Sequence, residues 1–194
     1  MSKKFLLFMF FATGFTTFVY EIVWTRELQL IFGSTIQSAS LLLTAFLSGF
    51  ALGALIISRV KIKYKSLITF GIIQILISIY AVLLIFAFEI LPLLYVLISN
   101  NILQLIICFS ILVIPAMMMG ATWPIVNKAF LKKDKNGEGA GELYAVNSFG
   151  AVAGSLLTGF ALIPALGLTT TSIIAVLINL LIGVFLLRGG LSED

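Results

Sequence analysis

The residues best suited to chemistry lie in one short run near the start of the chain. The run, Tyr20 to Glu27, combines two carboxylates, a guanidinium and two aromatic rings at the end of an apolar stretch, and its candidate substrate-binding residues are Tyr20, Glu21, Trp24 and Arg26. A carboxylate beside aromatic faces suits an organic cation or a coupled proton inside a membrane. Counted from Phe5, Glu21 lies about 24 Å along a core roughly 30 Å thick, so we place it near a boundary. The alternative is that the rings anchor the helix at the interface while the charges reach the headgroups.

Two further runs combine small residues with an isolated polar group. Gly49 and Gly53 lie four residues apart in one apolar run, and Gly150 and Gly154 do so in another. Small residues at this spacing share a helix face and let two backbones approach closely, so we assign these four glycines to helix packing. Asn147 shares the face of Gly150 and Gly154, and its carboxamide needs a partner, either another helix or a bound ligand. We include Asn147 among the candidate substrate-binding residues.

A third apolar run contains Pro115, Gly120 and Pro124. Each proline removes a backbone hydrogen bond, so we expect the helix to kink or partly unwind and to act as a hinge. Transporters build sites and hinges from such broken helices. The alternative is a static kink that packing accommodates. Trp123 in this run and Tyr144 in the next apolar run complete the set of candidate substrate-binding residues.

The composition indicates a membrane protein without catalytic machinery of its own. Of 194 residues, 61% are hydrophobic and 10% are charged, and the mean hydropathy is +1.19. The chain has no histidine and a single cysteine, Cys108, which excludes internal disulfides and thiolate or imidazole metal sites. A phosphate-binding glycine loop, an HExxH motif and a Gly-x-Ser-x-Gly turn are absent as well. We therefore expect no enzymatic activity, no catalytic residue, no metal and no cofactor.

Apolar runs between charge clusters predict a single all-α domain of six transmembrane helices, with lipid as its main solvent. The predicted spans are residues 5–24, 38–58, 66–88, 103–127, 141–163 and 169–187. Of the twelve Lys and Arg residues, an inside amino terminus leaves only Arg26 outside and the other eleven inside. Because basic residues resist translocation, we predict both termini on the cytoplasmic side of a prokaryotic inner membrane. Topology explains the net charge of +4, so we expect no nucleic-acid binding.

The charged segment 128–139 divides the predicted helices into two sets of three. The third span of each set, 66–88 or 169–187, is almost wholly apolar apart from Gln74 and Asn179. We expect these two helices to face lipid and the first two of each set to form the interior. A 3+3 arrangement of inverted halves is the resulting hypothesis for the architecture.

Three strings of the sequence are informative in combination: YEIVWTRELQLIFGSTIQSASLLLTAFLSGFALGALIISR, PAMMMGATWPIV and GELYAVNSFGAVAGSLLTGFALIPALGL. Together they resemble the membrane region of spermidine synthase-like membrane proteins, which are often described as fused major-facilitator/spermidine-synthase proteins. The resemblance covers nearly the whole chain. In that family a cytosolic aminopropyltransferase-like domain usually follows the membrane region, whereas this chain ends at Asp194. The resemblance implies a membrane unit similar to half of a major-facilitator transporter, without the aminopropyltransferase domain.

The residues and the resemblance together lead us to expect a small transporter for a polyamine or related organic cation. Six helices are few to enclose an alternating-access pathway, so we expect a homodimer. One alternative is a non-transporting anchor or regulatory module for a separately encoded aminopropyltransferase-like partner, bound through basic residues such as Lys132, Lys133 and Lys135. A second alternative is lipid handling, since the run from Glu21 to Arg26 lies at headgroup depth.

Overall fold

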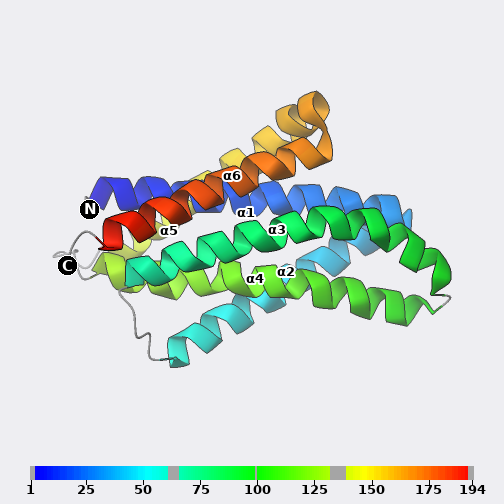
Figure 1. The fold of residues 1–194 in the computed structure, drawn as a ribbon, viewed down its shortest axis with the longest axis horizontal. Coiled ribbons are helices and arrows are strands. Elements are labelled where there is room, and N and C mark those ends of the chain that lie inside the picture. Colours follow the sequence, from blue (N-terminus) through cyan, green and yellow to red (C-terminus); the bar gives the residue numbers. More distant parts are fainter. Residues whose placement is uncertain (1–2, 61–65, 99, 132–138, 192–194) are drawn as a thin grey trace.

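The computed structural model describes residues 3–60, 66–98, 100–131 and 139–191, and these residues form helices and no strand. In chain order the elements are α1 (Lys3–Phe32), α2 (Thr35–Arg59), α3 (Ser66–Leu97), α4 (Asn101–Leu131), α5 (Gly139–Leu157), a π-helix (Thr158–Leu162) and α6 (Ile163–Leu191). Figure 1 shows an elongated bundle in which the start of α1 and the end of α6 lie at the same end. The prediction of an all-α fold is confirmed.

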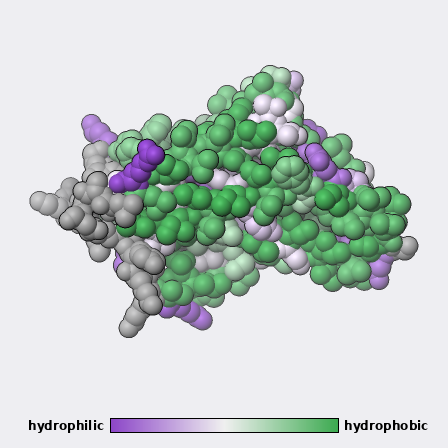
Figure 2. All heavy atoms as spheres, viewed as in Figure 1, coloured by the Kyte–Doolittle hydropathy of each residue, from purple (hydrophilic) through white to green (hydrophobic). Residues whose placement is uncertain are grey.

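Five helical segments are long and apolar enough to cross a membrane: Lys3–Phe32, Thr35–Arg59, Ser66–Leu97, Asn101–Phe130 and Gly139–Gly189. Hydrophobic residues cover most of the visible face of the bundle, and the strongly hydrophilic ones lie toward its two ends (Figure 2). An α-helix satisfies its backbone hydrogen bonds internally, as a segment without water around it must. These features agree with the predicted integral membrane protein.

The last of these segments contains a reversal of the chain. Gly139–Gly189 has 51 residues, which as one straight helix would extend about 77 Å. Gly167 interrupts it with φ 78° and ψ 176°, a left-handed conformation that glycine adopts without steric penalty. Figure 1 shows the chain turning back in this region. The segment therefore has two helical arms, one formed by α5 with the π-helix and the other by α6.

The helices extend beyond the predicted spans because charged residues do not end them. α1 continues to Phe32, past the charged run that was expected to close the first span. At the turn into α2, Gly33 has φ 64°, and the Ser34 hydroxyl accepts a hydrogen bond from the Gln37 amide at 3.4 Å. Before α4, the Asn100 side chain accepts from the first free amides of that helix. Such caps, rather than hydropathy, set the ends of these helices.

The helices pack in a pattern that relates the first three to the last three. The most extensive contacts join α2 to α4, α1 to α5 and α3 to α6. Exchanging α1, α2 and α3 with α4, α5 and α6 leaves this pattern unchanged, since α1–α5 becomes α4–α2 and α3–α6 remains itself. The smaller α3–α4 and α1–α6 contacts also exchange with each other.

Glycine residues allow the helix backbones to approach closely at the two most extensive helix contacts, α2–α4 and α1–α5. A Cβ at Gly150 or Gly154 would meet the backbone carbonyl of Phe11 or Phe15 in α1. Likewise, a Cβ at Gly53 would meet the backbone of Met117 in α4. Neighbouring Gly49 lies against Val113 and Ala116 of that helix. All four predicted packing glycines therefore lie where two helix backbones approach.

The expectation that α3 and α6 face lipid is wrong for one side of each helix. Gln74 and Asn179 are each only 2% exposed. The Asn179 side-chain oxygen accepts a hydrogen bond from the Thr16 hydroxyl at 2.7 Å, and its amide donates to the Tyr20 hydroxyl at 3.4 Å. Because an unpaired amide is costly in an apolar medium, the polar residue of α6 turns toward α1, and lipid-exposed apolar residues occupy the other side.

Candidate functional site

A cavity of about 370 Å³ lies among α1, α2, α4 and α5. Three predicted substrate-binding residues, Trp123, Tyr144 and Asn147, line it, although they come from two different helices. We call it the aromatic cavity, because five of its lining residues are aromatic: Phe10, Phe18, Phe50, Trp123 and Tyr144.

The rings of the aromatic cavity contact one another and leave one side open. The Trp123 ring centroid lies 5.8 Å from that of Tyr144 at 85°, and 5.6 Å from that of Phe10 at 40°. The Asn147 amide donates to the Phe10 carbonyl at 3.0 Å, and Tyr144 remains 65% exposed. The lining of the aromatic cavity contains no charged residue. Such a wall of ring faces can bind the apolar body and the positive charge of an organic cation.

Glu21 lies on the α1 face that lines the aromatic cavity, one turn beyond Thr17 and Phe18. Its side chain is partly exposed, and no residue in the described ranges pairs with its carboxylate. Only its backbone carbonyl is engaged, as the acceptor for the Thr25 hydroxyl at 2.6 Å. The arrangement places a carboxylate without a partner among the described residues one helical turn beyond the part of α1 that lines the aromatic cavity.

Tyr20 and Trp24 are core residues in this structure. Their side chains are 0% and 1% exposed, and their rings stack with centroids 5.1 Å apart and planes 20° apart. Trp24 also packs edge-on against Phe46 at 5.7 Å. Burial of this kind is incompatible with the alternative of interfacial anchors. It also keeps both rings away from the aromatic cavity, so they do not join the predicted residues of α4 and α5.

Arg26 points away from the other predicted residues. Its side chain is exposed, and its guanidinium donates to the Gln29 side chain at 3.1 Å. The seven predicted substrate-binding residues are therefore divided among the aromatic cavity, the core of the bundle and an exposed face of α1.

The predicted hinge residues lie in a continuous helix. α4 remains helical through Pro115, Gly120 and Pro124, and a Cβ at Gly120 would meet the backbone of Phe50 in α2. Partial unwinding is therefore not seen, and hinge motion at these residues stays a prediction. Irregular helical backbone is found instead after α5, in the π-helix that begins at Thr158.

A second cavity, of about 190 Å³, lies among α1, α3 and α6, and we call it the acidic cavity. The carboxyl-bearing residues Glu27 and Glu89 line it, together with Trp24 and the hydroxyl-bearing residues Thr169 and Ser172. The sequence pattern did not identify this site, because its polar residues come from three helices: Glu27 from α1, Glu89 from α3, and Thr169 and Ser172 from α6. Only the packing of those helices brings them together.

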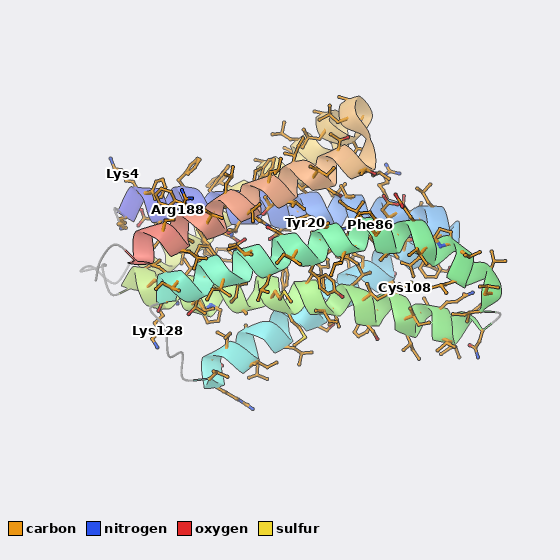
Figure 3. All side chains as sticks on the ribbon, viewed as in Figure 1. Lys4, Tyr20, Phe86, Cys108, Lys128 and Arg188 are labelled. Atoms are coloured by element: carbon orange, nitrogen blue, oxygen red, sulfur yellow. The ribbon has the colours of Figure 1, made fainter. Side chains whose placement is uncertain are left out.

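Basic residues gather at one end of the bundle. Figure 3 shows Lys4, Lys128 and Arg188 at this end, on α1, α4 and α6. Lys3 pairs there with Glu142 of α5 at 2.6 Å. Lys132, Lys133 and Lys135, assigned to binding of an enzyme partner, lie outside the described residues.

Within the described ranges, no group of three or more His, Cys, Asp or Glu side chains could hold a metal ion. Comparison with protein-family models, curated proteins and solved structures finds no match to this chain.

Proposed function

We propose that this protein is a small membrane transporter that moves a polyamine or related organic cation and acts as a homodimer. The aromatic cavity is the observation that carries the proposal, because it unites Trp123, Tyr144 and Asn147 from two helices with Glu21 one turn away. Along α1, Gly14 of this cavity is about 15 Å from Lys4, which is half the thickness of a hydrocarbon core. Transporters commonly bind their substrates at this midplane depth.

The proposed architecture has six spans in two inverted halves. The reversal at Gly167 supports two spans in place of one segment of 51 residues, since a core of roughly 30 Å needs only about 20 residues. The exchange of helix contacts between α1–α3 and α4–α6 supports a 3+3 repeat. Such a unit is similar to half of a major-facilitator transporter.

The proposed orientation has both termini inside a prokaryotic inner membrane. Basic side chains from three helices at one end of the bundle support it, because that end would face the cytoplasm.

The open side of the aromatic cavity supports the proposed homodimer. Tyr144 is 65% exposed, and a single copy would present this polar and aromatic opening to lipid. A second copy, related by a two-fold axis along the membrane normal, would face the first across the opening and enclose a shared path.

Uptake into proteoliposomes tests the proposal. We expect saturable uptake of labelled putrescine or spermidine, reduced at least tenfold by Glu21→Gln and severalfold by Tyr144→Leu. The matched control is Phe149→Leu, because Phe149 is equally exposed on α5, at 69%, and does not line the cavity. Absence of uptake by the wild type would exclude transport of these cations. Equal uptake by wild type and Glu21→Gln would remove the carboxylate from the mechanism.

The basic end of the bundle favours one alternative, an anchor for a separately encoded aminopropyltransferase-like partner. Lys4, Lys128 and Arg188 offer a positive surface at that end (Figure 3). Retention of such an enzyme by the reconstituted wild type, lost in Lys128→Gln, together with no uptake, would favour the anchor over the transporter.

A further inference from the structure

The acidic cavity carries two carboxylates without protein counter-charges. Glu27 of α1 and Glu89 of α3 line the same cavity, which has a volume of about 190 Å³. No basic side chain in the described ranges pairs with either of them, and neighbouring Arg26 is turned toward Gln29. The cavity therefore holds negative charge that no described residue neutralises.

Ser172 gives an independent indication of a ligand. Its side chain is 3% exposed and lines the acidic cavity. No described residue forms a hydrogen bond with its hydroxyl, and the hydroxyl oxygen is not sealed from the cavity. Buried hydroxyl groups normally have a partner, so this one is available to a molecule inside the cavity.

The remaining walls favour an organic ion over a bare metal ion. Trp24 contributes an aromatic ring, and Val23, Ile85 and Phe88 contribute apolar surface. An indole ring attracts a cation, and apolar walls accommodate an alkyl group. Two carboxylates also supply at most four of the roughly six to eight oxygen ligands that Ca²⁺ takes.

The position of the acidic cavity lowers the free-energy cost of keeping its carboxylates charged. Glu27 is 23 residues from Lys4 along α1, or about 35 Å, so it lies at the end of the bundle opposite the basic end. This distance slightly exceeds the thickness of a hydrocarbon core. The carboxylates are then at a membrane boundary, where charge is far less costly than at the centre.

We propose that the acidic cavity binds the ammonium group of a small organic cation between the carboxylates of Glu27 and Glu89. The ring of Trp24 contacts the cation, and the Ser172 hydroxyl accepts a hydrogen bond from its N–H. This binding is independent of the proposed transport function and of the aromatic cavity.

The two tryptophans of the chain make the binding measurable at each cavity separately, because Trp24 lines one and Trp123 lines the other. The Trp123→Phe protein in detergent carries Trp24 as its only indole. Titration with propylammonium should change its fluorescence saturably, whereas uncharged 1-propanol should not. Glu27→Gln and Glu89→Gln should each raise the apparent Kd at least tenfold, and Ser172→Ala should raise it severalfold.

The control is Glu142→Gln, which removes a carboxylate at the opposite end of the bundle and should leave this Kd unchanged. Far-UV circular dichroism shows which variants are folded, and Ser172→Ala gives a second measurement if a glutamine variant is not. An unchanged Kd in the folded variants would overturn the proposal. So would an equal response to 1-propanol, or saturable binding of Na⁺ or K⁺ in place of propylammonium.

Discussion

The aromatic cavity and the acidic cavity share α1 but are built in different ways. At the aromatic cavity, Gly14 and Gly150 bring the backbones of α1 and α5 together, and the lining carries no charge. At the acidic cavity, side chains of α1, α3 and α6 form the walls, and two of them are carboxylates. Along α1 the two sites are separated by the 13 residues from Gly14 to Glu27, or about 20 Å.

In the proposed membrane placement, the two cavities differ in depth as well as in charge. In the proposed placement the aromatic cavity lies near the midplane, where ring faces can contact a cation while the one carboxylate, Glu21, lies a turn beyond the lining. Near a boundary, carboxylates remain close to water and can supply stronger attraction. A cation that entered at the acidic cavity and reached the aromatic cavity would exchange charge for ring contacts.

The largest expected effect is on the backbone contact behind the aromatic cavity. Gly150→Ala places a Cβ against the Phe11 carbonyl, so α1 and α5 must separate, and we expect destabilisation of about 3 kcal/mol. Gly71→Ala, at the α3–α6 contact, meets its nearest atoms at 3.0 Å and should destabilise less.

Thermal unfolding in detergent, followed by circular dichroism, measures the order of these variants. Gly141→Ala is the control, since nothing lies within 4 Å of its Cβ and alanine favours helix by about 1 kcal/mol. Equal unfolding temperatures for Gly150→Ala and Gly141→Ala would contradict the close backbone contact.

The glycine contacts and the aromatic cavity could be predicted in part, because small residues four apart and polar residues within apolar runs have a local signature. Which helices pack against each other could not be predicted from the sequence. Hydropathy treats Gln74 and Asn179 as isolated polar residues in lipid-facing helices, while their burial depends on which helix lies opposite. Tyr20 and Trp24 show the same limit, since their sequence context suits an interface and their packing makes them core.

An intermediate effect is expected at the polar contact behind the acidic cavity. Asn179→Leu removes the donor to the Tyr20 hydroxyl and one of the two acceptors of the Thr16 hydroxyl, which also donates to the Thr13 carbonyl at 3.1 Å. A buried polar group left without its partner destabilises by about 1–3 kcal/mol. Because Tyr20 stacks on Trp24, the substitution should also shift Trp24 fluorescence in a Trp123→Phe background.

Comparison with Trp24→Phe, in which Trp123 is the only indole, separates local from global change. We expect Asn179→Leu to leave Trp123 fluorescence nearly unchanged. Equal shifts at both tryptophans would show that the two cavities are not structurally independent.

The smallest expected effect concerns the ion pair between Lys3 and Glu142, at the basic end of the bundle. Lys3 and Glu142 are 2.6 Å apart, with side chains 43% and 42% exposed, and exposed pairs contribute less than about 1 kcal/mol, screened by salt. Glu142→Gln should therefore change the unfolding temperature by a few degrees at most, and less at high salt.

Glu142→Gln also tests how the aromatic cavity binds a ligand. Tyr144 is two residues from Glu142 and lines the cavity with an exposed ring. If the cavity recognises cations without help from Glu142, Glu142→Gln should alter the Kd for tetraethylammonium less than threefold, whereas Tyr144→Leu should raise it severalfold, with Trp123 fluorescence as the readout. Equal losses of affinity in the two variants would mean that the charge of Glu142 assists binding. The contrast between a cavity with an uncharged lining and one with an acidic lining would then fail.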